Sequence, residues 1–250
     1  MFDDATTGHL LRLIDESPLG TVVDISILAG ELTIGLPFET LTSPDGRPLV
    51  LVPGVRLTRR LVGVERQATA PLPGPLKILA AVAGPDETST DNAPLDVEAE
   101  MQAVLDATSD LDGAAEVQVR ILEVASLPEI TAALKQDQYH VLHLSAHGNR
   151  TGIELENEDG EATFASTEAL ITAVRAGGHG LPLIVLSSCA GADGGVDGLA
   201  ASLITRGADR VLGMQATVTD PYATEFARRL YQSLAGDPDA TVGQALAAAR

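Results

Sequence analysis

The sequence predicts an α/β fold in which helices cover both faces of a mostly parallel sheet. Strand-like and helix-like segments alternate about five times along residues 71–250, which is the pattern of a parallel sheet. Every gap between successive strands is long enough for the crossover that parallel neighbours require. The chain has four Phe, three Tyr and no Trp, so its core must be built from Val, Leu, Ile and Ala, as is typical of parallel sheets between helices.

Five apolar segments, bounded by turn residues, have the composition of buried strands. These strands are expected at residues 76–83, 117–124, 139–146, 182–188 and 210–214. Apolar residues at helical spacing, with N-cap and first-turn proline signals such as Asp220-Pro221, indicate the helices. They are expected at residues 94–108, 128–136, 166–176, 196–206, 220–234 and 240–250. An Asp159-Gly160 turn predicts a hairpin over residues 152–164.

Two proline-rich stretches punctuate the first third of the chain. Ser43-Pro44-Asp45-Gly46 predicts a turn, and residues 49–52 after it have the composition of a strand. Residues 71–75, Pro-Leu-Pro-Gly-Pro, have the composition of a stiff linker. We therefore expect an N-terminal strand or hairpin segment at residues 1–70, packed on a larger domain at residues 71–250.

Composition argues against several classes of function. The formal net charge of −19 repels phosphate backbones and anionic lipid heads, so neither nucleic acid nor a membrane is expected as a partner. The same charge could select a basic partner or simply maintain solubility. No signal-peptide pattern or membrane-length apolar run is present, and the single cysteine, Cys189, excludes an internal disulfide. We therefore expect a cytoplasmic protein, and a preference for Arg over Lys suggests a bacterial source.

Two of the expected strands end in residues capable of chemistry. Residues 139–146 are followed by His147 and Gly148, and residues 182–188 by Cys189. Because catalytic groups collect beyond the carboxyl ends of parallel strands, a thiol and an imidazole leaving neighbouring strands can approach each other. The imidazole could exchange the thiol proton, and the N–H groups of Gly148 and Cys189 could bind an oxyanion. The pattern alone is also compatible with an inert buried cysteine and an ordinary strand end.

His143 and His147 have the same strand parity, which could suggest a metal pair. No third ligand at a suitable spacing accompanies them, whereas a zinc site needs three or four ligands. We therefore expect neither a metal nor a cofactor, and interpret His143 as a packed, hydrogen-bonded histidine.

The two strand ends resemble the catalytic motifs of CHAT domains, which are bacterial relatives of caspases and separase. Residues 139–148, Tyr-His-Val-Leu-His-Leu-Ser-Ala-His-Gly, resemble the histidine motif, and residues 183–191, Leu-Ile-Val-Leu-Ser-Ser-Cys-Ala-Gly, the cysteine motif. Upstream, residues 36–41 resemble the family's Pro-Trp-Glu-Leu segment, with Phe38 in place of the usual Trp. The resemblance covers roughly residues 30–250.

This resemblance implies a caspase-like three-layer α-β-α sandwich with the activity of a cysteine endopeptidase. Cys189 would be the nucleophile, His147 would protonate the leaving amine, and Gly148 would be an oxyanion donor. Ser187, two residues before the cysteine, would line the pocket for the substrate side chain that precedes the cut. Members of the family act on proteins or peptides and are usually held inactive until a sensor domain or partner activates them. They are often associated with bacterial defence, including antiphage defence.

Three further residues are candidates for substrate binding. Asp193, just past the cysteine, could select a basic side chain or be a solvated loop carboxylate. Gln215 directly follows the fifth expected strand, at the end where a bound peptide could pair its backbone. Asp220 could contact substrate, or serve only as the N-cap of its helix.

Two other functions have to be weighed against a peptidase. A caspase-like fold could be a catalytically silent interaction or scaffold module, although a complete His-Cys pair argues against this. A flavodoxin-like ligand binder would need a Gly-rich phosphate loop after the first strand, which residues 82–86 do not provide.

Overall fold

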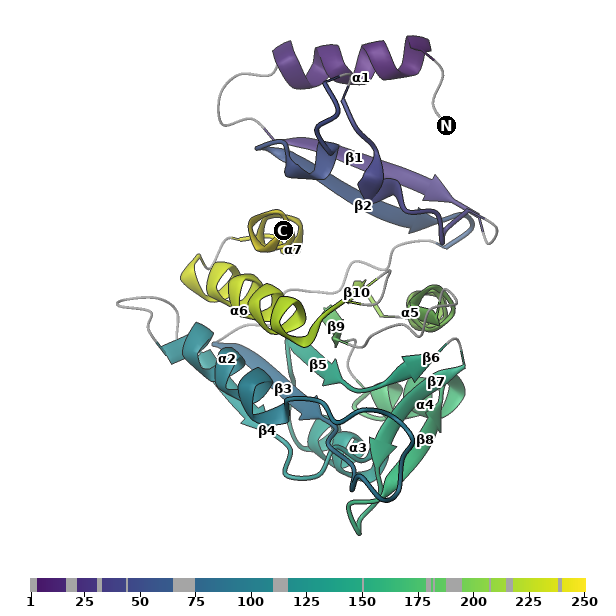
Figure 1. The fold of residues 1–250 in the computed structure, drawn as a ribbon, viewed down its shortest axis with the longest axis vertical. Coiled ribbons are helices and arrows are strands. Elements are labelled where there is room, and N and C mark those ends of the chain that lie inside the picture. The colour runs from purple at the N-terminus through teal and green to yellow at the C-terminus, as the bar shows by residue number, and fades with distance from the viewer. Residues whose placement is uncertain are drawn as a thin grey trace.

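A five-stranded parallel sheet forms the centre of the computed structural model (Figure 1). Its order is β4-β3-β5-β9-β10, and every neighbouring pair is parallel. The strands are β3 (Leu76–Val82), β4 (Val117–Ile121), β5 (Val141–Ser145), β9 (Leu183–Ser187) and β10 (Val211–Gly213). The structure describes residues 4–16, 22–30, 33–43, 45–64, 75–109, 117–149, 151–178, 181, 183–187, 195–206, 208–214, 218–237 and 240–250.

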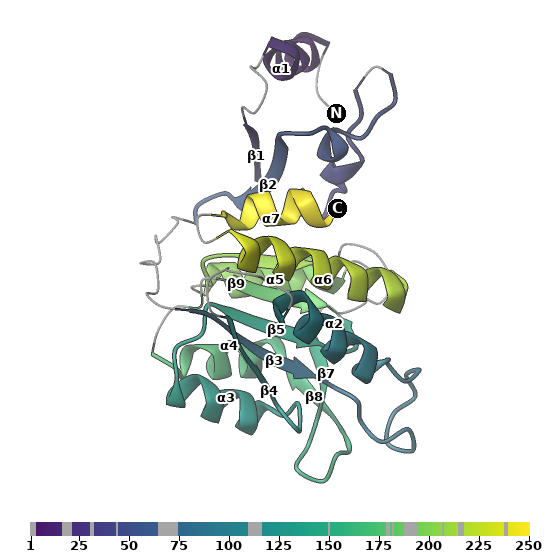
Figure 2. The same cartoon turned by 90° about the vertical axis from the view of Figure 1, so that its left-hand side faces the viewer.

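Helices cover both faces of this sheet, so the predicted three-layer α-β-α sandwich with a parallel sheet is confirmed (Figure 2). One face packs against α3 (Leu127–Gln136), α4 (Thr167–Arg175) and α5 (Gly195–Thr205). The other packs against α2 (Val97–Ser109) and α6 (Asp220–Gly236), and α7 (Val242–Ala249) packs on the outer side of α6. Side chains of β5 alternate between the layers, since Leu142 and Leu144 join the first apolar cluster and Val141 the second.

Local sequence signals set the starts of several helices. Ser126 caps α3 by accepting the Glu129 N–H, and Ser166 caps α4 by accepting the Ala169 N–H. Thr241 and Gln244 form a reciprocal capping box at the start of α7. The N-cap residue of α6 is Thr219, so the sequence placed this cap one residue too late, at Asp220.

The N-terminal segment contains α1 (Asp4–Glu16), β1 (Val23–Ala29) and β2 (Val55–Leu61). β1 and β2 pair in parallel, so the hairpin alternative is wrong for these two strands. Parallel neighbours need a long connection, and here residues 30–54 separate the end of β1 from the start of β2. The strand expected at residues 49–52 is also wrong, because Leu49–Leu51 is a 3-10 turn. Its apolar side chains are buried by packing with Leu41 and Leu57 rather than by strand pairing.

The N-terminal strands meet the rest of the chain through α7, which lies between β2 and α6 (Figure 2). Arg56 of β2 donates to the Thr241 hydroxyl at 3.3 Å, and Arg250 lies 3.4 Å from the Glu39 carboxylate. The proposed linker falls mostly on residues 71–74, outside the described residues. The division at residue 70 therefore stays a prediction.

A small antiparallel sheet follows β5 and comprises β6 (Gly148–Asn149), β7 (Gly152–Glu156) and β8 (Ala162–Ser166). The hairpin predicted over residues 152–164 is confirmed by the pairing of β7 with β8. Gly160 in its turn has a φ of 80°, a left-handed conformation that glycine adopts without steric cost.

Glu156, the last residue of β7, ties this hairpin to the ends of two strands of the central sheet. Its Oε1 accepts the Gly84 N–H at 2.6 Å and its Oε2 accepts the Ala125 N–H at 2.8 Å. Both oxygens of a buried carboxylate are therefore used by backbone donors that follow β3 and β4.

Replacing Glu156 by glutamine is expected to lower the free energy of unfolding by about 1–3 kcal/mol. The amide has only one acceptor oxygen, so its NH₂ would face a backbone N–H that loses its partner. Urea unfolding followed by circular dichroism measures the change. Glu158→Gln, on an exposed residue of the same hairpin, is the matched control, and an equal response of the two variants would contradict the bonding role of Glu156.

Candidate active site at the carboxyl ends of the strands

β5 and β9 are direct neighbours and end together, because their last residues, Ser145 and Ser187, are partners in the register. His147 comes two residues after Ser145, and Cys189 comes two residues after Ser187. Cys189 lies outside the described residues. The structure thus gives the position of the histidine and of the strand that leads to the cysteine.

The imidazole of His147 is oriented by a backbone carbonyl. Its Nε2 lies 2.7 Å from the carbonyl oxygen of Ala93, in the loop before α2. A carbonyl can only accept, so Nε2 carries the proton and donates it to this bond. In the neutral ring, Nδ1 is then the nitrogen with a free lone pair, and it is the atom that can accept a proton from a reacting group.

The backbone around His147 is held by the small antiparallel sheet. The Glu154 N–H donates to the His147 carbonyl at 2.7 Å, and Gly148 opens β6 opposite Ile153. His147 and Gly148 are both half-buried. These bonds fix the direction in which the chain leaves β5.

The candidate substrate-binding residues are placed only in part. Ser187 is the last residue of β9 and is buried, and its carbonyl accepts from the Ser145 hydroxyl at 3.2 Å. Asp220 is the first residue of α6. Asp193 and Gln215 lie outside the described residues. The substrate contacts of all four remain predictions.

A buried polar network contacts the end of β5 on the face of the sheet that α2 and α6 cover. Its centre is Glu100 of α2, whose Oε2 accepts the Ser145 hydroxyl and whose Oε1 lies 3.1 Å from His143 Nε2. His143 Nδ1 lies 2.8 Å from the hydroxyl of Tyr231 on α6. The prediction that His143 is a packed, hydrogen-bonded histidine is therefore confirmed.

The charge state of this network follows from its contacts. Burial opposes ionisation of Glu100, but the hydrogen bonds from His143 and from the Ser145 hydroxyl outweigh it and hold the pKa below its ordinary 4.5. Burial, and then the negative charge of Glu100, raise the pKa of Tyr231 well above 10. The phenol therefore stays neutral, and its O–H can donate to the lone pair of His143 Nδ1.

The depressed pKa of Glu100 predicts an acid-sensitive contribution to stability. Since the folded-state pKa lies below the unfolded value, ionised Glu100 stabilises the fold above about pH 4.5, and this is lost as pH falls through the folded-state pKa. The difference in unfolding free energy between the native chain and Glu100→Gln should therefore shrink as pH falls from 7 to 3. Denaturant titrations across this range test it, and a difference that grows on acidification would contradict the assignment.

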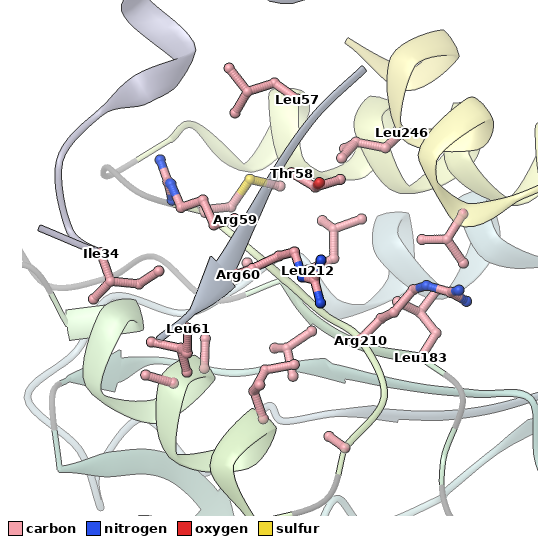
Figure 3. Close-up of a pocket in the computed structure, with 18 of the residues that line it drawn as sticks. Ile34, Leu57, Thr58, Arg59, Arg60, Leu61, Leu183, Arg210, Leu212 and Leu246 are labelled. Carbon is pink, nitrogen blue, oxygen red and sulfur yellow. The ribbon is translucent and has the colours of Figure 1, made fainter. Parts of the chain in front are cut away.

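A cavity of about 970 Å³ lies away from these residues, between β2, the edge strand β10 and helices α5 to α7 (Figure 3). Leucines and arginines line it, and none of His147, Gly148 and Ser187 does. Four of its arginines are already paired with carboxylates: Arg59 and Arg250 with Glu39, Arg206 with Glu168, and Arg210 with Asp209. The cavity is therefore separate from these three described residues of the candidate active site.

Two features are absent from the part of the chain that the structure describes. Within these ranges, no three His, Cys, Asp or Glu side chains are grouped so that they could hold a metal ion. None of the helices that the structure describes has the length and apolar character needed to span a membrane.

Comparison with known proteins identifies the family of the chain. A solved structure of a secreted C11 cysteine protease from Bacteroides thetaiotaomicron, "iotapain", is similar at 15% identity and a TM-score of 0.42. The similarity covers 64% of this chain and 58% of that protease, so the chain matches little more than half of its length. No curated protein matches the chain. The CHAT domain model matches residues 19–250, nearly the whole sequence, and the chain therefore belongs to the CHAT domain family.

Proposed function

We propose that the chain is a caspase-like cysteine endopeptidase in which Cys189 is the nucleophile and His147 its acid/base partner. The observation that carries this proposal is the register of the sheet: Ser145 and Ser187 are partners, and the two reactive residues follow them at equal spacing. Membership of the CHAT family supports it further.

The proposed chemistry begins with transfer of the thiol proton to Nδ1 of His147, whose Nε2–H is held by the Ala93 carbonyl. The thiolate attacks the peptide carbonyl carbon, and backbone N–H groups such as those of Gly148 and Cys189 stabilise the oxyanion. The C–N bond then breaks, and Nδ1–H protonates the leaving amine. Water hydrolyses the resulting thioester, with the imidazole as base, and the free thiol is restored.

The substrate and regulation belong to the same proposal. The substrate would be a protein or peptide, with Ser187, Asp193, Gln215 and Asp220 as candidate contacts. A regulatory partner or a sensor region would activate the enzyme in the bacterial cytoplasm, in a defence role that could include antiphage defence. Low activity of the isolated chain is expected on this basis, and strong unregulated cleavage would contradict that part.

Covalent labelling provides the direct test. Because Cys189 is the single cysteine, a library of peptidyl electrophiles followed by intact-mass spectrometry reports on that thiol alone. We expect stoichiometric labelling of the native chain, loss of label in His147→Ala, and loss of both label and peptide cleavage in Cys189→Ala. Cleavage that survives Cys189→Ala would overturn the proposal. A thiol that reacts only at the rate of a free peptide thiol, whether or not His147 is present, would favour the silent scaffold module instead.

A further inference from the structure

The buried carboxylate of Glu100 joins the two strands that lead to the proposed dyad. Glu100 accepts the hydroxyl of Ser145, the last residue of β5. The same hydroxyl oxygen lies 3.2 Å from the carbonyl of Ser187, the last residue of β9. The single hydroxyl proton of Ser145 is therefore shared between the carboxylate from α2 and the carbonyl of β9, at two strand ends that are each two residues short of a proposed catalytic group.

The orientation of this carboxylate is fixed from the opposite side. His143 Nε2 lies 3.1 Å from Oε1 of Glu100, and the Tyr231 hydroxyl lies 2.8 Å from His143 Nδ1. With the phenol donating to Nδ1, the ring carries its proton on Nε2 and donates it to Oε1. Oε2 is thereby left for Ser145. The chain of bonds runs from α6 through β5 to α2 and back to the strand ends.

Burying such a network costs more free energy of desolvation than filling the same space with apolar side chains. A carboxylate in an apolar interior is destabilising unless its oxygens are hydrogen-bonded, and a well-packed apolar side chain is often at least as stabilising. Glu100 is only 7% exposed, and both His143 and Tyr231 are completely buried. A fully satisfied polar network does, however, hold its members in one geometry. That property suits a place where two strands must deliver reactive groups side by side.

We propose that Glu100 is a positioning residue for the active site, which sets the relative placement of the β5 and β9 ends and so of His147 and Cys189. This inference rests on the proposed peptidase function. Glu100 acts through the Ser145 hydroxyl and the Ser187 carbonyl rather than by touching the reacting atoms. Displacements of about 1 Å in such a site can cost on the order of 100-fold in rate.

The test measures the rate at which iodoacetamide labels Cys189 in the full chain at 25 °C. The reagent needs no peptide substrate, and because the chain has a single thiol, the label reports on Cys189 alone. Glu100→Gln keeps the shape of the side chain and removes its charge. We expect its labelling rate at pH 7 to fall roughly tenfold or more, and the pH profile of labelling to move toward that of an ordinary thiol. The titratable groups that face Glu100 are His143 from β5 and, beyond it, Tyr231 from α6.

Two further variants separate positioning from folding. Glu98→Gln makes the same change on an exposed residue of the same helical turn, and we expect it to label at the native rate. Ser145→Ala removes only the hydroxyl that links Glu100 to Ser187, and we expect it to slow labelling while the protein remains folded at 25 °C, as judged by its melting curve. With a peptide substrate, Glu100→Gln and Ser145→Ala should each lower kcat more than they raise KM.

The outcomes distinguish this inference from the proposed function. If His147→Ala slows labelling but folded Glu100→Gln and Ser145→Ala label at the native rate, the positioning role is wrong and the dyad stands. A lower melting temperature with an unchanged labelling rate has the same meaning, because it shows a purely structural role. If labelling is insensitive to His147 as well, the peptidase proposal fails.

Discussion

Replacing His147 by alanine is expected to reduce kcat/KM for peptide cleavage roughly 10³–10⁴-fold, while the free energy of unfolding changes by no more than about 1 kcal/mol. The ring is half-buried at the strand ends, and its Nε2 bonds the Ala93 carbonyl. Its removal would leave the Ala93 carbonyl to water. It would also take away the group that we propose accepts the thiol proton and protonates the leaving amine. Steady-state cleavage of a fluorogenic peptide, with urea unfolding in parallel, measures the two quantities.

His9→Ala is the control for this substitution, because His9 is an exposed histidine on α1. The helix α1 lies far from β5 and β9 (Figure 1). Its kcat/KM should stay within about twofold of the native value, as expected for a surface substitution outside any site. A His147→Ala variant that keeps more than a tenth of the native kcat/KM would show that another group moves the proton.

Replacing Gly152 by alanine is expected to destabilise the fold by about 3 kcal/mol or more. An added Cβ would collide with the carbonyl oxygen of Ala165 and would lie 2.9 Å from both the Ala165 carbonyl carbon and the Ser166 Cα. These are backbone atoms of the neighbouring strand, so rotation of a side chain cannot relieve the contact. β7 and β8 would have to separate, although their pairing also holds the backbone beside His147.

Gly30→Ala tests whether the loss of glycine alone has this effect. No heavy atom lies within 4 Å of a Cβ built on Gly30, and its backbone is outside the left-handed region. Thermal and urea unfolding should show this variant near the native stability. A Gly152→Ala protein within about 1 kcal/mol of the native chain would mean that the two strands pair more loosely than the structure indicates.

The central sheet could be predicted from the sequence because its signals are local. Residues 182–188 form an apolar run between turn residues, and β9 occupies Leu183–Ser187. The strand expected at residues 139–146 corresponds to β5 at Val141–Ser145. The parallel pairing of β1 with β2 was missed because the partner of a strand is set by contacts far along the chain. Residues 49–52 were misassigned because burial of Leu49 and Val50 against other apolar residues produces the same composition as a strand.

The sequence indicated two candidate reactive residues, whose roles stay predictions, but not the polar network beside the strand ends. The sequence indicated His147 and Cys189 because each follows an apolar strand. Glu100 was missed, although a signal was present: with Ala103, Val104 and Ala107 it forms the buried face of α2 at helical spacing. A carboxylate at an apolar position of a helix requires a buried partner. The bond from His147 to the Ala93 carbonyl could not be foreseen, because only tertiary folding brings that backbone atom to the ring.

The distribution of tyrosines gives this protein a built-in optical readout. Since the chain has no tryptophan, its intrinsic fluorescence comes from Tyr139, Tyr222 and Tyr231. Tyr139 belongs to the apolar cluster on one side of the sheet and Tyr231 to the cluster on the other, whereas Tyr222 is 48% exposed. Tyrosine-to-phenylalanine variants can therefore assign an emission change to one layer of the sandwich, so that melting of the two layers can be followed separately without an added dye.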